Sequence, residues 1–475
     1  MPTVAFHTLG CKVNFYDTEG IWQVFKHRGY EQVPFEEKAD VYVVNTCTVT
    51  HTGDKKSRQV IRRAVRTNPD AVVVVTGCYA QVAPDEVARI AGVDLVIGND
   101  QKSKIVDHVE RVQREQHPYQ SVGNIMKADA FEELDVPYFE ERSRANLKIQ
   151  DGCNNFCTFC IIPRARGLIR SRKPENVIAQ ATKLAQAGYR EIVLTGIHTG
   201  GYGTDFEGYR LADLLADLER IELPFRIRIS SIEASEIDDH VIDVLGRSQK
   251  VVNHLHIPLQ AGSDAVLRRM HRHYTVAEYA AKLEQLRRAL PDLAITSDVI
   301  VGFPGETDDD FENTYAFVEE QCFSQIHVFP YSQRRGTAAA KFGDQVAEDV
   351  KHGRVTRMIE LSERLAEAYA SRFVGRHLDV IAESPVISAD EETRRAFAAH
   401  PEKGRMLVGY AGNYLRVAFR APEGMPLESL VGELIRVRVA ETGSGVQQGH
   451  FVEQLTSADD EHHATTASVN GRLTS

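Results

Sequence analysis

The 475-residue sequence has no run of about 18 apolar residues, the length that a membrane-spanning helix needs. Its first residues show neither a basic start nor a long apolar stretch, so we see no secretory signal and expect a cytoplasmic protein. The sequence also has no excess of positive charge, since 56 basic and 67 acidic side chains give a net charge of −11 at pH 7. A nucleic-acid partner would therefore have to be bound by local basic patches.

Cysteine is scarce, and the seven thiols make an odd number. In a reducing compartment, clustered cysteines are more often metal ligands or catalytic groups than disulfides. Six of the seven fall into two groups of three. The seventh, Cys322, lies in an apolar stretch, and we expect it to be a core residue.

Three apolar runs of strand length near the N-terminus each lead into a cysteine. Residues 4–9 precede Cys11, residues 41–44 precede Cys47, and residues 72–75 precede Cys78. Helix-like segments between the runs predict alternating strands and helices around a parallel sheet. The carboxyl ends of parallel strands share one edge of a sheet, so the three cysteines can converge there. The alternative is three unrelated buried cysteines.

Farther along the chain, strand-like runs alternate with helical segments six times. These runs cover residues 145–149, 191–194, 225–229, 253–257, 295–301 and 325–329. Six β/α units predict a partial or complete parallel barrel, with its chemistry at the carboxyl ends of the strands. After about residue 375 we expect the helices to stop and short β-rich runs to form a small OB-like barrel.

The patterns together predict an α/β protein of five parts. These are an N-terminal parallel β/α domain at 1–115, a connecting segment at 116–140, a six-unit β/α barrel of partial TIM type at 141–372, a small all-β barrel at 373–456 and a disordered tail at 457–475.

Cys153, Cys157 and Cys160 form a C-x3-C-x2-C motif directly after the first strand of the predicted six-unit barrel. Three thiolates on one short loop can ligate three irons of a 4Fe-4S cluster and leave the fourth iron with an open position. A structural zinc ion usually takes four protein ligands, and the loop offers no fourth. A zinc-stabilised RNA-binding protein, with both triads structural, remains the alternative from another class.

The sequence resembles the radical SAM methylthiotransferases. The matching segments are TLGCKVN at 8–14, NTCTVT at 45–50, residues 152–166 and DVIVGFPGET at 298–307. The resemblance implies that Cys153, Cys157 and Cys160 ligate the radical SAM cluster and that Cys11, Cys47 and Cys78 ligate an auxiliary 4Fe-4S cluster. It also implies that the small β-barrel is a TRAM domain.

The segments around Cys11 and Cys47 are most similar to the subgroup that modifies N6-threonylcarbamoyladenosine next to the anticodon of tRNA. The implied reaction inserts sulfur and a methyl group at C2 of that adenosine, with two 4Fe-4S clusters and S-adenosylmethionine as cofactors. The implied partners are tRNA, a cellular electron donor and a sulfur source, without a membrane or a stable protein partner. The alternatives share the chemistry but act on isopentenyladenosine of tRNA or on a ribosomal-protein aspartate.

The resemblance also implies contacts to S-adenosylmethionine at the ends of barrel strands. The candidates are Thr195, Gly196, Gln260 and Gly302. Glycine lets backbone approach a ligand closely, although glycine-containing loops follow most barrel strands. No catalytic residue beyond the cluster ligands is assigned, and the histidines near the strands are left without a role.

Two basic patches are candidates for contacts to the tRNA backbone. The first lies on a predicted helix and the second follows the barrel cysteines. Their members are Lys55, Lys56, Arg58 and Arg62 in the first patch and Arg164, Arg166 and Arg170 in the second. Such patches bind phosphates by releasing counterions. The alternative for each patch is a solvated helix face or an internal ion-pair network.

Overall fold

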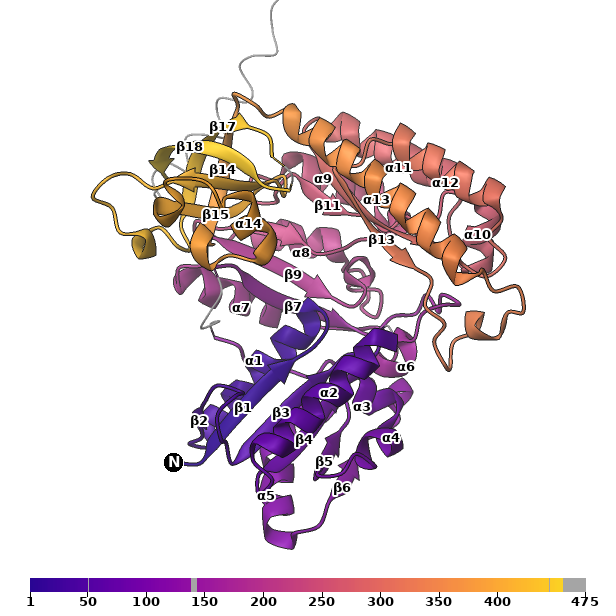
Figure 1. Cartoon of the computed structure of the whole chain (residues 1–475), viewed down its shortest axis with the longest axis vertical. Coiled ribbons are helices and arrows are strands. Elements are labelled where there is room, and N and C mark those ends of the chain that lie inside the picture. The colour runs from indigo at the N-terminus through magenta and orange to yellow at the C-terminus, as the bar shows by residue number, and fades with distance from the viewer. Residues whose placement is uncertain (50, 138–142, 444, 456–475) are drawn as a thin grey trace, which may run out of the picture.

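The computed structural model describes residues 1–49, 51–137, 143–443 and 445–455, so the predicted tail at 457–475 lies outside the described residues. Figure 1 shows the N-terminal domain below the six-unit barrel, with the small β-barrel at the upper left. No helix in the described part of the chain is both long and apolar enough to span a membrane.

The N-terminal domain is a six-stranded parallel sheet in the order β2-β1-β3-β4-β5-β6. Apolar residues of α2, α3 and α4 pack on one face, and those of α1 and α5 pack on the other. The bounds are β1 Thr3–Thr8, α1 Lys12–His27, β2 Glu31–Gln32, β3 Val41–Thr46, α2 His51–Thr67, β4 Val72–Gly77, α3 Cys78–Val82, α4 Pro84–Ala88, β5 Leu95–Ile97, α5 Ile105–Glu115 and β6 Tyr119–Ser121.

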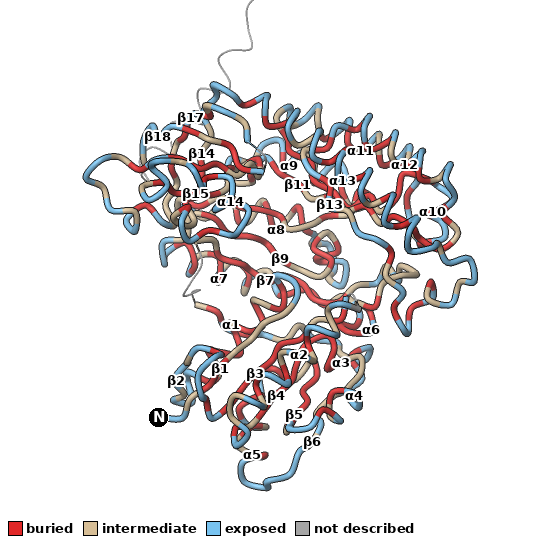
Figure 2. The backbone as a smooth tube through the Cα atoms, in the orientation of Figure 1, coloured by how far each residue is buried: buried red, intermediate tan, exposed pale blue. Residues whose placement is uncertain are grey.

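The three predicted strands that lead into cysteines are β1, β3 and β4, which are neighbours in this sheet. β3 and β4 are rich in valine and almost entirely buried, as helices on both faces require, whereas β1 is only partly buried (Figure 2). β6 lies within the segment expected to connect two domains, and it pairs with β5. Its three residues carry no alternating apolar pattern that could have indicated a strand.

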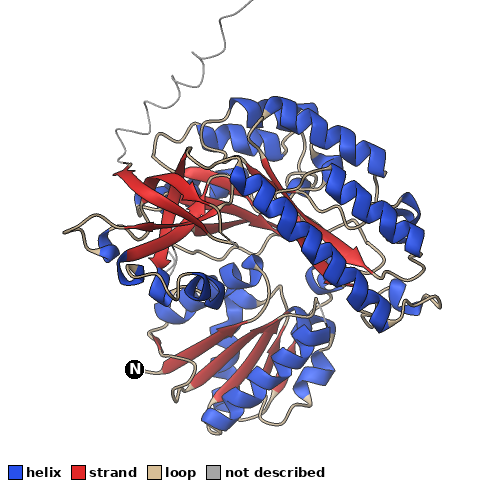
Figure 3. Ribbon diagram, turned by 45° about the horizontal axis from the view of Figure 1, so that its top comes forward, coloured by secondary structure: helices blue, strands red, loops and turns tan. Residues whose placement is uncertain are grey.

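The six predicted barrel strands are all present as β7, β9, β10, β11, β12 and β13. They form two sheets, β10-β9-β7-β8 and β11-β12-β13, linked through a bridge between Ile227 and Val251. Helices cover the outside of both sheets (Figure 3). The bounds are β7 Ala145–Asp151, α6 Ile162–Arg166, β8 Arg170–Ser171, α7 Pro174–Gln186, β9 Glu191–Gly196, α8 Leu211–Glu219, β10 Arg226–Ile229, α9 Asp239–Arg247, β11 His254–His256, α10 Asp264–Arg269, α11 Val276–Ala289, β12 Ala294–Val301, α12 Asp308–Glu320, β13 Gln325–Pro330 and α13 Glu348–Ser371.

The small β-barrel is closed, in the order β14-β15-β16-β18-β17. Its elements are β14 His377–Pro385, α14 Glu391–Ala396, β15 Met406–Ala411, β16 Arg416–Arg420, β17 Leu434–Glu441 and β18 Gln447–Gln454. The expectation that helices stop here is wrong at α14. Asp390 caps this short helix by accepting a hydrogen bond from the Thr393 backbone N–H.

Two arginines of β10 attach the small β-barrel to the six-unit barrel. Arg226 donates to the backbone carbonyls of Asp379 and Tyr410, at 2.7 and 2.8 Å. Arg228 donates to the carbonyl of Ala411 at 3.0 Å. The buried Glu191 carboxylate pairs with both guanidinium groups, at 2.6 and 2.7 Å, and so fixes their orientation.

A buried ion network joins the N-terminal domain to the six-unit barrel. At its centre is Asp17 on α1, whose carboxylate pairs with Lys102 at 2.6 Å and with Lys148 and Arg166 at 2.8 Å. Asp151 at the end of β7 completes the network by pairing with Lys148 and Arg166, at 2.7 and 3.1 Å. All five side chains are almost fully buried, so the two domains can satisfy these charges only in this relative position.

We expect Asp17→Asn to lower the free energy of unfolding by about 3–5 kcal/mol, because it leaves buried cations without their counter-charge. Lys102, Lys148 and Arg166 hold the pKa of Asp17 well below its usual range despite its burial. The carboxylate therefore stabilises the fold fully above the unfolded-state pKa of about 4, and this stabilisation declines as the pH falls below that value.

Urea denaturation at pH 7 and at lower pH measures the effect. The control is Asp107→Asn, which breaks an exposed pair with Arg28 and should cost under about 1 kcal/mol. Equal effects of the two substitutions would show that the buried network does not hold the domains together.

Candidate active site

The first cysteine triad lies at the edge of the N-terminal sheet that faces the six-unit barrel. Cys11 precedes α1, Cys47 follows β3, and Cys78 is the first residue of α3 after β4. Gly10 permits their approach, because it has a φ of +110° and a Cβ there would lie 3.2 Å from the Cys47 Sγ. Burial, followed by the nearby thiols of Cys78 and Cys11, raises the pKa of Cys47 to about 11.

The second triad lies on the loop between β7 and α6, at the carboxyl end of the barrel. Burial raises the pKa of the Cys160 thiol to about 12, and the neighbouring thiols of Cys157 and Cys153 add to this effect. Backbone N–H groups of Asn155 and Ile162 donate to the sulfur atoms of Cys153 and Cys160, at 3.5 and 3.4 Å. Such N–H···S bonds stabilise sulfur that carries negative charge.

Each triad has its own arginine. Arg166 donates from Nε to the Cys78 Sγ at 3.4 Å, and Arg272 donates from Nη1 to the Cys157 Sγ at 3.3 Å. In the buried network, Lys102, Lys148 and Arg166 outnumber Asp17 and Asp151 by one positive charge. Arg166 brings positive charge from this network to the Cys78 sulfur, where it suits an anionic thiolate or an anionic cluster.

The sulfur positions do not fit a closed zinc site. Four thiolates around one zinc ion, with Zn–S bonds of 2.3 Å, would lie about 3.8 Å apart. All six cysteines belong to the described residues, and in neither triad do the three sulfur atoms all lie within 4.8 Å of one another. The wider spacing, the three thiols per site and the adjacent arginines fit a cluster of several irons.

The four candidate contacts to S-adenosylmethionine all lie at carboxyl ends of barrel strands. Thr195 and Gly196 end β9, Gln260 follows β11 with a φ of +66°, and Gly302 follows β12. The Thr195 hydroxyl is buried and donates to the Val193 carbonyl. Backbone conformation and packing both account for Gly302, since its φ is +70° and a Cβ there would lie 2.3 Å from the Lys351 Cγ.

His198, to which the sequence assigned no role, lies beside the second triad. Its Nε2 is 2.5 Å from a carboxylate oxygen of Glu236. Burial lowers the pKa of His198, but hydrogen bonds to the Cys153 thiol and to Glu236 outweigh burial and raise it to about 10. Sequence reasoning missed Arg272 and Glu236 because their partners are distant in the chain.

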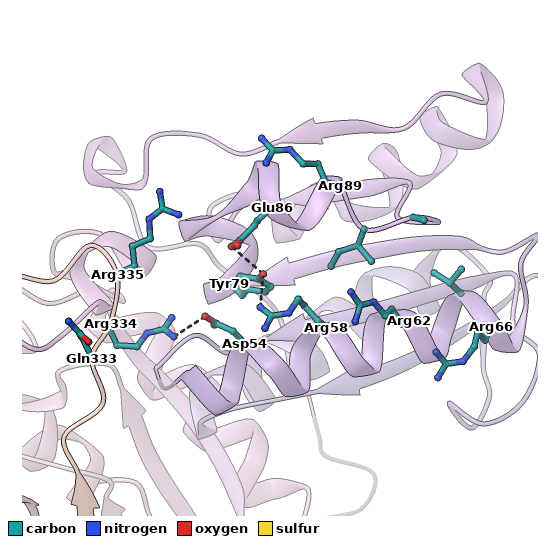
Figure 4. Close-up of a pocket in the computed structure, with 13 residues that line it drawn as sticks. Asp54, Arg58, Arg62, Arg66, Tyr79, Glu86, Arg89, Gln333, Arg334 and Arg335 are labelled. Carbon is teal, nitrogen blue, oxygen red and sulfur yellow. Dashed lines mark hydrogen bonds and ion pairs between the residues drawn. The ribbon is translucent and has the colours of Figure 1, made fainter. Parts of the chain in front are cut away.

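A basic cleft of about 740 Å³ lies between α2, α4 and the loop at 333–335 (Figure 4). Arg58, Arg62 and Arg66 line it from one face of α2, and Arg89 and Arg335 from the other elements. Arg334 also lines it, but it is paired with Asp54 at 2.8 Å. Lys55 and Lys56 of the predicted patch are exposed on α2 without lining this cleft.

The second basic patch differs from its prediction. Arg164 is exposed, but Arg166 is fully buried in the ion network and Arg170 is buried with its guanidinium on the carbonyls of Leu168 and Arg166. Both guanidinium groups therefore have partners within the protein, and their contact with tRNA stays a prediction. A local run of arginines cannot reveal that Asp17, almost 150 positions earlier in the chain, neutralises one of them.

Cys322 is also placed differently from its prediction. It follows α12 with a φ of +46° and is exposed, with its Sγ near the carbonyls of Glu319 and Glu320. The apolar neighbours that suggested burial belong to other faces of the surrounding elements.

Two family models match the chain. Residues 3–98 match one described as the uncharacterised protein family UPF0004, and residues 147–318 match the radical SAM superfamily. The second match indicates one 4Fe-4S cluster and S-adenosylmethionine as cofactors. The solved structure of the radical S-adenosylmethionine methyltransferase TsrM from Kitasatospora setae is similar in fold, with a TM-score of 0.52 and 15% identity over 70% of this chain and 75% of that one.

Curated relatives are much more similar in sequence. The chain is 56% identical to the threonylcarbamoyladenosine tRNA methylthiotransferase MtaB of Bacillus subtilis, over 97% of this chain and 99% of that protein. It is 42% identical to the protein of the same name from Aquifex aeolicus, over 79% and 91% of the two chains. It is 35% identical to a tRNA-2-methylthio-N(6)-dimethylallyladenosine synthase of Carboxydothermus hydrogenoformans, over 91% and 96%. The chain therefore belongs to the threonylcarbamoyladenosine tRNA methylthiotransferase family of radical SAM enzymes.

Proposed function

We propose that this chain inserts a methylthio group at C2 of N6-threonylcarbamoyladenosine in tRNA. The observation that carries the proposal is the pair of three-cysteine sites on two domains joined by one buried ion network. A 4Fe-4S cluster held by three thiolates would keep one coordination position open, which one site would use for S-adenosylmethionine and the other for the sulfur to be donated. A tRNA substrate would place the chain in the cytoplasm, with an electron donor and a sulfur source as further partners.

The ligand sets follow from the two triads. Cys153, Cys157 and Cys160 would hold the radical SAM cluster, and Cys11, Cys47 and Cys78 would hold an auxiliary cluster. When bound, the first group supplies a radical, which abstracts hydrogen from an unreactive carbon, and the second group supplies a sulfur atom for transfer. The chain's residues hold, orient and electrostatically balance these groups.

The arginines and histidine beside the triads would set the charge of the site. Arg166 and Arg272 each donate to a ligating sulfur, which favours the anionic form of that sulfur. Glu233 pairs with Arg272 and orients its guanidinium group. The strand-end residues Thr195, Gly196, Gln260 and Gly302 would offer backbone to S-adenosylmethionine.

The basic cleft would take the tRNA backbone. Arg62, Arg66, Arg89 and Arg335 are exposed and line the cleft from three elements. The loop that carries Arg335 is tied to the auxiliary site, because Arg334 also donates to the Thr48 hydroxyl, next to Cys47. Phosphates bound there would lie on the N-terminal domain that carries the first triad.

The triple variant Arg62→Ala, Arg66→Ala and Arg89→Ala should weaken tRNA binding by on the order of tenfold. It should also flatten the dependence of affinity on salt, because fewer counterions are released. Filter binding at several salt concentrations measures both. Arg288→Ala on α11, whose exposed guanidinium pairs with Glu284, is the control. An unchanged salt dependence in the triple variant would remove the cleft from the tRNA interface.

The two triads should be separable by mutation. Cys11→Ala should lose methylthiolation and keep some cleavage of S-adenosylmethionine, whereas Cys157→Ala should lose both, because only the second triad lies in the radical SAM barrel. Chromatography of 5′-deoxyadenosine and of modified nucleosides measures the two activities. Cys322→Ala removes an exposed cysteine outside both triads and should keep both activities. Equal loss of cleavage in the two triad variants would contradict the division of roles.

The substrate is tested by mass spectrometry of nucleosides from total tRNA of cells with and without this gene. Without it, methylthiolated threonylcarbamoyladenosine should disappear and the unthiolated form should accumulate. If the methylthiolated isopentenyladenosine disappears instead, isopentenyladenosine is the substrate. Unchanged tRNA nucleosides would contradict a tRNA substrate and point to the ribosomal protein.

A further inference from the structure

Three metal-ligating side chains meet on the inner face of the six-unit barrel, away from both cysteine triads in the sequence. They are His256 on β11, Asp298 on β12 and His327 on β13. Asp298 and His327 are register partners, and His256 pairs with Thr296, two residues before Asp298 on the same face. One ligand atom from each lies within 4.8 Å of the other two, and no other group of this kind occurs among the described residues.

The strand alternation shows that this face is open. Leu255, Val299 and Ile326, which point to the opposite face, are buried in the core that the helices cover. His256 and Asp298 are instead partly exposed, and His327 is exposed. The three side chains are therefore accessible from the barrel interior and are not part of the packed core.

A relay behind His256 fixes its orientation. The Thr296 hydroxyl lies 3.0 Å from the His256 Nδ1 and 3.0 Å from the His254 Nε2. His254 is buried and stacked on Tyr414, with ring centroids 4.5 Å apart and planes 18° apart. The other nitrogen of His256, Nε2, is directed to the Asp298 carboxylate at 3.3 Å. A histidine whose second nitrogen is fixed by a hydrogen bond is the usual arrangement of a metal ligand.

The donor set has a specific coordination chemistry. Two imidazoles and one carboxylate on one side of an ion leave the remaining positions open, as in the 2-His-1-carboxylate sites of divalent transition metals. One divalent ion with one carboxylate and two neutral imidazoles keeps a net charge of +1. The open positions would therefore favour an anionic oxygen ligand.

We propose that His256, Asp298 and His327 bind one divalent transition-metal ion whose open positions take the carboxylate of the threonylcarbamoyl group. The second half of this proposal rests on the proposed function. The threonyl part of that substrate carries a carboxylate and a hydroxyl group, and an isopentenyl group carries neither. A metal ion on the barrel wall would thus contribute to the choice between the two modified adenosines.

Titration of the holoenzyme with Mn²⁺ tests the metal site. With both 4Fe-4S clusters oxidised and diamagnetic, electron paramagnetic resonance reports free Mn²⁺ directly, after EDTA has removed adventitious metal. We expect one Mn²⁺ per chain, with affinity at least tenfold lower in Asp298→Asn and in His327→Ala. Thr296→Val, which removes only the hydroxyl behind His256, should weaken binding by about tenfold.

His240→Ala, which removes an exposed histidine on α9, is the matched control and should bind Mn²⁺ as the natural sequence does. Iron content of each variant reports that the barrel and its clusters are intact. Equal Mn²⁺ binding by the natural sequence, the ligand variants and the control would overturn the metal site, as would the absence of saturable binding.

The contact between the metal ion and the substrate carboxylate is tested with free nucleosides, and this test needs no catalytic turnover. Threonylcarbamoyladenosine should tighten Mn²⁺ binding at least threefold, whereas its methyl ester and isopentenyladenosine should not. Equal effects of acid and ester would overturn the carboxylate contact. The nucleoside analysis of cellular tRNA tests the proposed function separately, so failure of the metal site and failure of the substrate assignment give different results.

Discussion

The position of the two cysteine triads relative to each other depends on one buried carboxylate. Asp17 lies on α1, the helix that begins directly after Cys11, and it pairs with Lys148 of β7 and Arg166 of α6 in the other domain. Burying charges costs desolvation free energy, which is recovered only when every partner is in place. An apolar contact would tolerate small rotations of one domain against the other, whereas this network permits one arrangement. The network therefore fixes the relative orientation of the two domains more than it adds to the free energy of unfolding.

Positive charge is concentrated at a few places in the molecule. The chain is acidic overall, with a net charge of −11, yet it concentrates cations where anions are expected. Arg166 and Arg272 face sulfur atoms, and the arginines of the basic cleft face solvent between α2, α4 and the 333–335 loop. Acidic surface elsewhere would discourage polyanions from binding away from the cleft.

The sequence predicted what depends on local pattern. Apolar runs that lead into cysteines predicted β1, β3 and β4, and the convergence of the cysteines at one sheet edge followed from the geometry of parallel sheets. What it could not predict depends on partners far along the chain. A surface patch was predicted at Arg166 and Arg170, because a short stretch of sequence does not show Asp17 or the backbone carbonyls that these arginines contact. The exposure of Cys322 depends on the backbone turn after α12, and the meeting of His256, Asp298 and His327 depends on strand register.

Part of the attachment of the small β-barrel depends on side chains of the six-unit barrel alone. Arg226 and Arg228 bind main-chain carbonyls of Asp379, Tyr410 and Ala411, and every amino acid supplies such a carbonyl. Mutations that alter the side chains of those strands leave these hydrogen bonds in place, provided the backbone path is kept. Residues 379, 410 and 411 can therefore change in sequence while Glu191, Arg226 and Arg228 keep the small β-barrel attached. The ion pairs Arg144–Glu383 and Arg190–Glu433 and the stacking of His254 on Tyr414 instead need a particular side chain on each partner. Coevolution between the two barrels is therefore expected at those side-chain pairs and not at the main-chain contacts.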